Sequence, residues 1–256
     1  MSQKSYRNQT MRLLVSVADA TEASAALVGG ADVIDAKDAT AGALGAVSLD
    51  ALSEIRDVVA GARLLTAALG DAIDEASVEE SAYAYAAAGA VLVKVGFAGI
   101  INPLRVGAIV SAAVRGAQAG NAAAGVIAVA YADADRVASI PRDPLVEVAG
   151  RAGAKGLLLD TADKMGPGLR GLVTPTALAQ WVVKAHDAGL LVALAGQLTA
   201  DDLSFVREAG ADIVGVRGAA CEGGRNGRVT AERVRQLRLK CGEPVGAAHG
   251  VAERRV

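Results

Sequence analysis

The chain has 256 residues, a formal net charge of −2 at pH 7 and a sequence pI near 5.8. There is no basic excess and no apolar run of membrane-spanning length, so we expect a cytoplasmic protein that binds neither nucleic acid nor a membrane. The residues are 52% hydrophobic but only 3% aromatic, which suits strands buried on both faces. The two cysteines, Cys221 and Cys241, lack metal-ligand spacing, so neither a disulfide framework nor a zinc site is expected.

Short apolar runs follow a Gly-Ala step four times, at intervals of roughly 60 residues. Each step ends an alanine-rich stretch, as a helix C-terminal cap followed by a strand would. Four further apolar runs lie between these, and the predicted strands in chain order are 12–17, 32–35, 63–69, 91–95, 125–131, 155–160, 190–196 and 212–216. Helical patterns fill the gaps, at 21–28, 49–59, 78–88, 104–117, 144–151, 175–188, 200–208 and 231–240.

Strict alternation of strand and helix predicts a parallel sheet of the α/β class. Eight such units in this length predict one domain, a closed (β/α)8 TIM barrel over residues 11–241. An open doubly wound sheet is the alternative, and it is disfavoured because no G-x-G-x-x-G motif follows the first strand. Residues 1–10 are expected to form a flexible N-terminal arm and residues 242–256 a flexible C-terminal tail.

Three lysines fall where parallel strands end, which is where such barrels carry their catalytic groups. Lys37 follows the second predicted strand, Lys94 lies in the fourth, and Lys164 comes shortly after the sixth. Asp35 and Asp160 accompany them, and Asp35 faces the same side as Lys37 if the strand continues that far. Any one of these lysines is also compatible with a solvated loop. Their placement on alternate strands favours a shared site.

The surroundings of these lysines would determine their pKa and therefore their reactivity. Burial and a neighbouring ammonium group both lower the pKa of a lysine, whereas a nearby carboxylate raises it. A lysine that is neutral near pH 7 can attack a carbonyl carbon, while another carries protons. The pattern therefore predicts Schiff-base or carbanion chemistry on a carbonyl compound.

The last two predicted strands point to phosphate. In such barrels the loops after strands 7 and 8 often bind phosphate through backbone N–H groups. Here those loops contain Gly196, Gln197, Arg217 and Gly218, which we predict to bind a substrate phosphate. The glycine-rich stretch at 222–228 fits either a surface loop or a substrate lid. Ser16, Thr66 and Asp133 also fall at strand ends, without an assigned role.

At these residues the sequence resembles a known family, the (5-formylfuran-3-yl)methyl phosphate synthases of methanofuran biosynthesis. The stretches that carry the resemblance span roughly residues 11–241 and are LLVSV, GGADVIDAKDATAGALGA, YADADRV, LLLDTADK, LAGQL and DIVGVRGAACEGGRNGR. Such long stretches are far more specific than a single Asp-x-Lys motif.

The resemblance implies a class I aldolase-like barrel and lyase activity. It implies the condensation of two molecules of glyceraldehyde 3-phosphate, a triose phosphate, to a furan aldehyde phosphate, with loss of phosphate and water. Lys37 is then the Schiff-base lysine and Lys94 the proton acceptor, with Lys164, Asp35 and Asp160 as supporting residues. A Schiff base of this kind requires neither a metal nor an organic cofactor.

Other interpretations stay open. Another class I aldolase, or a barrel lyase that stabilises a carbanion without an imine, would use a similar Asp-x-Lys motif. A non-enzymatic phosphate-binding barrel is disfavoured, because arginine and backbone N–H groups would serve it better than buried lysines. The oligomeric state is also open, since the alanine-rich outer helices suit either a second copy of the chain or solvent.

Overall fold

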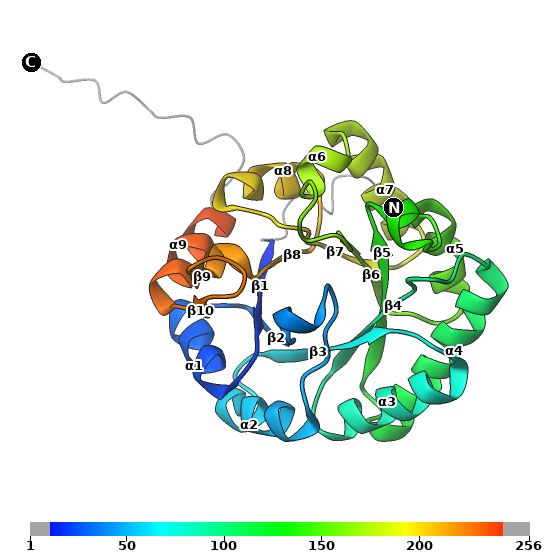
Figure 1. Ribbon diagram of the computed structural model, residues 1–256, viewed down its shortest axis with the longest axis horizontal. Coiled ribbons are helices and arrows are strands. Elements are labelled where there is room, and N and C mark those ends of the chain that lie inside the picture. The colour runs from blue at the N-terminus through cyan, green and yellow to red at the C-terminus, as the bar shows by residue number, and fades with distance from the viewer. Residues whose placement is uncertain (1–10, 243–256) are drawn as a thin grey trace, which may run out of the picture.

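The computed structural model describes residues 11–242 of the chain. Within them, eight parallel strands pair in sequence order, and β1 pairs with β8 to close the barrel (Figure 1). The predicted TIM barrel is thereby confirmed. The predicted arm 1–10 and all but the first residue of the predicted tail lie outside the described residues. The barrel strands are β1 (Arg12–Val17), β2 (Val33–Ala36), β3 (Leu64–Asp71), β4 (Leu92–Gly96), β5 (Gly125–Tyr131), β6 (Gly156–Asp160), β7 (Leu191–Leu194) and β8 (Ile213–Val216).

Helices form a ring around the strands (Figure 1). They are α1 (Ala20–Gly29), α2 (Leu49–Val59), α3 (Glu75–Ala87), α4 (Pro103–Gly120), α5 (Arg142–Arg151), α6 (Leu169–Leu172), α7 (Pro175–Asp187), α8 (Leu203–Glu208) and α9 (Ala231–Gly242). The short helix α6 was not expected from the sequence. The glycine-rich stretch after β8 holds a 3-10 turn, η5 (Gly218–Ala220), and a small antiparallel hairpin of β9 (Cys221–Glu222) and β10 (Arg228–Val229).

The repeated Gly-Ala step ends four of the helices. Its glycines Gly30, Gly89, Gly153 and Gly210 have φ between 85° and 114°, a left-handed conformation that other residues rarely adopt. In the first three steps the alanine N–H donates to the carbonyl five residues earlier, as in a Schellman cap. The chain then turns directly into a strand, which explains why the sequence repeat marks strand starts.

Apolar side chains fill both the space between strands and helices and much of the barrel interior. Inside the barrel, β1, β5, β6 and β8 contribute the large residues Leu14, Ile127, Leu158 and Ile213. Strands β7 and β8 also present small residues, and the interior is hollow beside them.

Within residues 11–242, no helix combines the length and apolar character needed to cross a membrane.

Candidate active site

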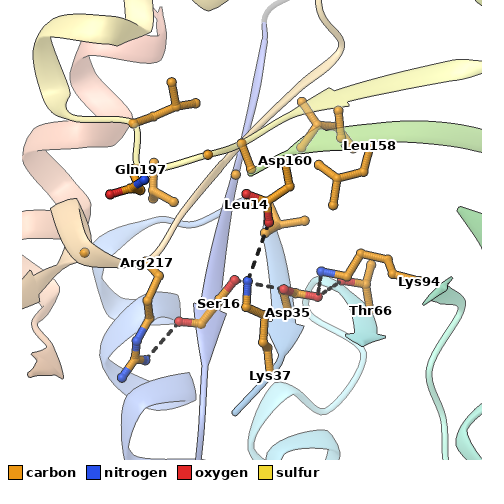
Figure 2. A pocket seen from close by; sticks show the side chains of 18 of the residues that line it. Leu14, Ser16, Asp35, Lys37, Thr66, Lys94, Leu158, Asp160, Gln197 and Arg217 are labelled. Carbon is orange, nitrogen blue, oxygen red and sulfur yellow. Dashed lines mark hydrogen bonds and ion pairs between the residues drawn. The ribbon is translucent and has the colours of Figure 1, made fainter. Parts of the chain in front are cut away.

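A cavity of about 280 Å³ opens at the carboxyl ends of the strands. Its floor is apolar, whereas its mouth is polar. The cavity is lined by all three predicted lysines and both predicted aspartates, and Figure 2 shows Lys37, Lys94, Asp35 and Asp160 directed toward one another. The floor residues are Leu14, Leu92, Ile127, Leu158, Leu191, Ala193 and Ile213. The convergence predicted from the strand ends is therefore present.

Asp35 is the most deeply held of these groups. Its carboxylate accepts hydrogen bonds from Ser16 Oγ at 2.8 Å and Thr66 Oγ1 at 2.7 Å, and Lys94 Nζ lies 2.5 Å away. Ser16 and Thr66 are the register partners of Asp35 on β1 and β3, so all three side chains stand at one level of the barrel. Asp35 is fully buried, and a buried carboxylate needs this full set of partners.

Asp160, at the end of β6, forms a second centre. Its carboxylate accepts from Lys164 Nζ at 2.6 Å and from the Thr161 backbone N–H at 2.8 Å, and Lys37 Nζ lies 3.9 Å away. Burial by itself would raise the pKa of Asp160. The ammonium groups of Lys164 and Lys37 and the hydrogen bonds outweigh burial, so the pKa of this carboxyl is lowered. Asp160 is therefore an anion placed between two lysines.

Lys37 has the most altered amine of the site. Burial, together with the ammonium groups of Lys94 and Lys164, lowers its pKa to about 8, although Asp160 and Asp35 act in the opposite direction. Its backbone N–H donates to Val17 O at 2.9 Å, so the pairing with β1 continues past the end of β2. This continuation directs Lys37 to the same side as Asp35, as predicted.

The pairs in space differ from the pairs in sequence. Asp35 precedes Lys37 by two residues, but its close cation is Lys94 from β4. Lys37 instead lies beside Asp160 from β6. Only the Asp160–Lys164 pair is present in both the sequence and the structure. For Lys37 and Lys94, the carboxylate partner is therefore one that the local sequence did not indicate.

Two side chains hold the loop that carries Lys164 in place: Asp133, to which the sequence gave no role, and Gln197, which was predicted to bind phosphate. The buried Asp133 accepts the backbone N–H groups of Ala162 at 2.7 Å and Asp163 at 2.8 Å. Gln197 Nε2 donates to the carbonyls of Asp163 at 3.3 Å and Gly166 at 3.1 Å. The one signal that could have identified Asp133, Ser16 and Thr66 was their position at strand ends.

The opposite side of the mouth is rich in backbone donors. Gly196 and Gln197 both have left-handed backbones, with φ of 105° and 55°. Among the described residues, no acceptor is found for the backbone N–H groups of residues 196–198, or for those of Gly218 and Ala219 at the start of η5. All five residues line the cavity. Such clusters of unpaired N–H groups suit an anion.

Arg217 borders the same region, but its guanidinium is bonded to the protein. Nε donates to Arg225 O, Nη1 to Ser16 O and Glu22, and Nη2 to Glu22 and Gly227 O. These contacts use all five N–H donors of the side chain. The predicted role of Arg217 in phosphate binding stays a prediction, and this arrangement gives its side chain a structural role.

The fold and the site together define a (β/α)8-barrel enzyme with a lysine-lined cavity at the carboxyl ends of its strands. Comparisons with known proteins name its family. The profile of the 4-HFC-P synthase family matches residues 13–238, so the chain belongs to that family and the resemblance seen in the sequence is confirmed.

Two relatives and one solved structure illustrate the match. The chain is 38% identical over 236 residues to the (5-formylfuran-3-yl)methyl phosphate synthase of Methanocaldococcus jannaschii, covering 90% of this chain and 100% of that protein. It is 39% identical over 229 residues to the synthase of the same name from Methanopyrus kandleri, covering 88% and 97%. KGPDC from Streptococcus mutans has a TM-score of 0.67 at 16% identity, covering 93% and 100%, a likeness that shows the fold alone.

Proposed function

We propose that this enzyme condenses two molecules of glyceraldehyde 3-phosphate to (5-formylfuran-3-yl)methyl phosphate, with loss of phosphate and water, in methanofuran-type biosynthesis. The names of its relatives support the product, and the cavity supports the chemistry. The observation that carries the mechanism is the Lys37 amine, which is buried at the cavity with a pKa of about 8. About a tenth of such amines are neutral at pH 7, which is enough to start attack on an aldehyde.

The first step joins Lys37 to substrate. Nζ of the neutral amine attacks the aldehyde carbon of one triose phosphate, and the carbinolamine loses water to give an iminium ion. The iminium withdraws electrons from the adjacent carbon, so a proton there becomes removable. Asp160, an anion near Lys37 and bonded to Lys164, is placed to take up and return the protons of the departing water.

Lys94 and Asp35 then handle the carbon-bound proton. They form a close ion pair, with Nζ and a carboxylate oxygen 2.5 Å apart, so a proton passes between the two groups with little motion of either. Ser16 and Thr66 hold the Asp35 carboxylate in place throughout. Removal of the proton allows phosphate to leave, which gives an enol whose terminal carbon, the one that carried the phosphate, is a nucleophile. That carbon attacks the middle carbon of the second triose, which has first tautomerised from aldehyde to ketone, and loss of water then closes the furan ring with its substituents at positions 3 and 5. The N–H groups of the β7 and β8 loops would hold the phosphate that is retained.

The apolar floor suits the later steps. A triose enters with hydroxyl groups, whereas a furan ring is flat and has lost them. The leucine and isoleucine side chains beneath the lysines exclude water and offer a surface for that ring.

The test is incubation of the full chain with glyceraldehyde 3-phosphate. We expect furan absorbance and phosphate release, and we expect borohydride to trap the substrate on Lys37, as located by peptide mapping. Lys37→Arg should lose both trapping and turnover. Lys155→Arg is the matched control, because Lys155 is exposed at the opposite end of β6 and should leave both unchanged. Label on another lysine would overturn the assignment of Lys37, and an aldol product without a furan would favour an ordinary aldolase.

A further inference from the structure

Arg225 lies at the turn between β9 and β10 and lines the cavity. It stands directly against the start of η5. A Cβ added at Gly218 would lie 3.4 Å from the backbone nitrogen of Arg225 and 3.8 Å from its Cβ. Arg225 is therefore next to the unpaired backbone N–H groups of Gly218 and Ala219.

The protein fixes Arg225 from two sides. Arg217 donates to Arg225 O at 3.2 Å and to Gly227 O at 3.0 Å, which holds the hairpin turn against the end of β8. Nη2 of Arg225 donates to Ala39 O at 3.0 Å and to Gly42 O at 2.7 Å. Those carbonyls belong to the loop that follows Lys37, so Arg225 bridges the phosphate side of the mouth and the lysine side.

Part of the Arg225 guanidinium is left without a protein acceptor. Among the described residues, its hydrogen bonds all come from Nη2, while Nε and Nη1 retain three N–H donors. No carboxylate of the described chain lies within ion-pair distance of it. Arg217 is the opposite case, with its donors fully used and Glu22 as a buried partner. Of these two arginines beside the cavity, Arg225 is thus the one with both charge and donors to offer a ligand.

We propose that Arg225 is the charged contact for the substrate's phosphate group, completing the site made by the backbone N–H groups of the β7 and β8 loops, and that Arg217 positions it. The proposal rests on the proposed function for the identity of the phosphate ester. A half-buried guanidinium beside oriented N–H groups forms charge-assisted hydrogen bonds with phosphate, which are about twice as strong as neutral ones.

Through the same contacts, phosphate bound at Arg225 would be linked to the loop that follows Lys37. Phosphate held by Nε or Nη1 would be tied, through Nη2 and the carbonyls of Ala39 and Gly42, to the loop after Lys37. The site would therefore set the distance between the phosphate of a substrate and the amine that attacks its aldehyde.

The experiment compares Arg225→Met and Arg225→Lys with Arg228→Met. Arg228 is the matched control, because it is on the same hairpin but is exposed and pairs with Asp19 at the surface. Calorimetry with inorganic phosphate should show binding weakened about tenfold or more in Arg225→Met, partly restored in Arg225→Lys, and unchanged in Arg228→Met. With glyceraldehyde 3-phosphate, KM should rise by a similar factor and kcat should change less. Arg217→Lys, which keeps the charge but loses the planar fork, should weaken phosphate binding and raise KM in the same direction.

A second readout separates phosphate binding from imine chemistry. Borohydride trapping of glyceraldehyde, which has no phosphate, should be as fast in Arg225→Met as in the wild type. Wild-type phosphate affinity in a folded Arg225→Met would overturn the proposal. If that variant melts early, phenylglyoxal modification of the wild type decides: phosphate must slow modification of Arg225, and an unchanged rate overturns the proposal. Calorimetry measures phosphate binding and does not require turnover. Absence of a furan product would therefore refute the proposed function, while the test of phosphate binding by Arg225 could still be carried out.

Discussion

At the scale of single residues, the site depends on the charge state of one amine. Lys37 is buried near Lys94 and Lys164, and the cost of burying its charge dominates its pKa of about 8. Asp160 opposes that cost without cancelling it. The balance yields a lysine that is partly neutral at physiological pH and stays close to a proton carrier.

We predict that imine formation follows the titration of Lys37. The neutral amine is the nucleophile, so the rate of borohydride trapping should rise with pH and level off above about 8. Asp160→Asn removes the carboxylate that raises this pKa, so the midpoint should move to lower pH. Asp201→Asn, a surface change, is the control and should leave the midpoint in place. A midpoint near 10.5, the ordinary lysine value, would contradict the assignment.

The strand-end residues were predictable one by one, because a β-α alternation fixes where each strand stops. Their partners were not. Asp35 and Lys94 lie on different strands separated by β3, and only the closure and register of the barrel bring their side chains to 2.5 Å. Arg225 had no signal beyond its charge within a glycine-rich stretch.

At the scale of elements, α4 packs closely against α3 at two of its glycines, Gly116 and Gly120, but not at a third, Gly107. A Cβ at Gly116 would lie 2.0 Å from the Glu79 carbonyl oxygen, and one at Gly120 would lie 2.3 Å from that of Tyr83. At Gly107 the nearest atom, a Val148 methyl carbon, is 3.6 Å away, an ordinary contact. The two helices thus approach through positions that have no side chain.

Gly116→Ala is therefore expected to lower the free energy of unfolding by about 1–3 kcal/mol, because the helices must separate to admit the methyl group. Gly107→Ala should instead raise it by up to about 1 kcal/mol, because alanine favours the helix and nothing is displaced. Urea denaturation of both variants and the wild type measures the sign of each change in the free energy of unfolding. Equal effects would show that the α3–α4 contact is looser than the structure has it.

Element boundaries illustrate what sequence patterns determine. The strands 12–17 and 125–131 have their predicted bounds, because each apolar run there begins at a charged residue or a glycine. The helix predicted at 78–88 begins earlier, at Glu75, where Asp74 accepts the Ser77 N–H as its N-terminal cap. The β9–β10 hairpin was not predicted, because its four strand residues form no periodic pattern.

At the scale of the whole molecule, one buried ion pair joins the first and last units of the barrel. Glu22 of α1 is 1% exposed and accepts from Arg217 at the end of β8, from the Ala18 N–H and from the Val229 N–H. The pair thus lies at the seam where β1 meets β8. Its members are 195 residues apart in sequence.

Arg217→Met should lower the free energy of unfolding by about 3–5 kcal/mol, because it leaves the Glu22 carboxylate buried without its cation. Arg228→Met removes an exposed pair with Asp19 and should cost no more than about 1 kcal/mol. Fluorescence of Trp181, a buried residue and the chain's one tryptophan, follows unfolding in urea. Similar losses in the two variants would show that the seam does not depend on this pair.

The amino-acid sequence by itself determined the barrel, the ends of its strands and the gathering of three lysines at one mouth. These follow from local signals, since apolar periodicity, helix caps and glycine turns act over a few residues. Only the tertiary structure decided which carboxylate governs which lysine, that Arg217 is bonded to the protein, and that Arg225 faces the cavity. The physical reason is that electrostatic and hydrogen-bond partners are set by distance in space, and here the decisive distances join strands and loops far apart in the chain.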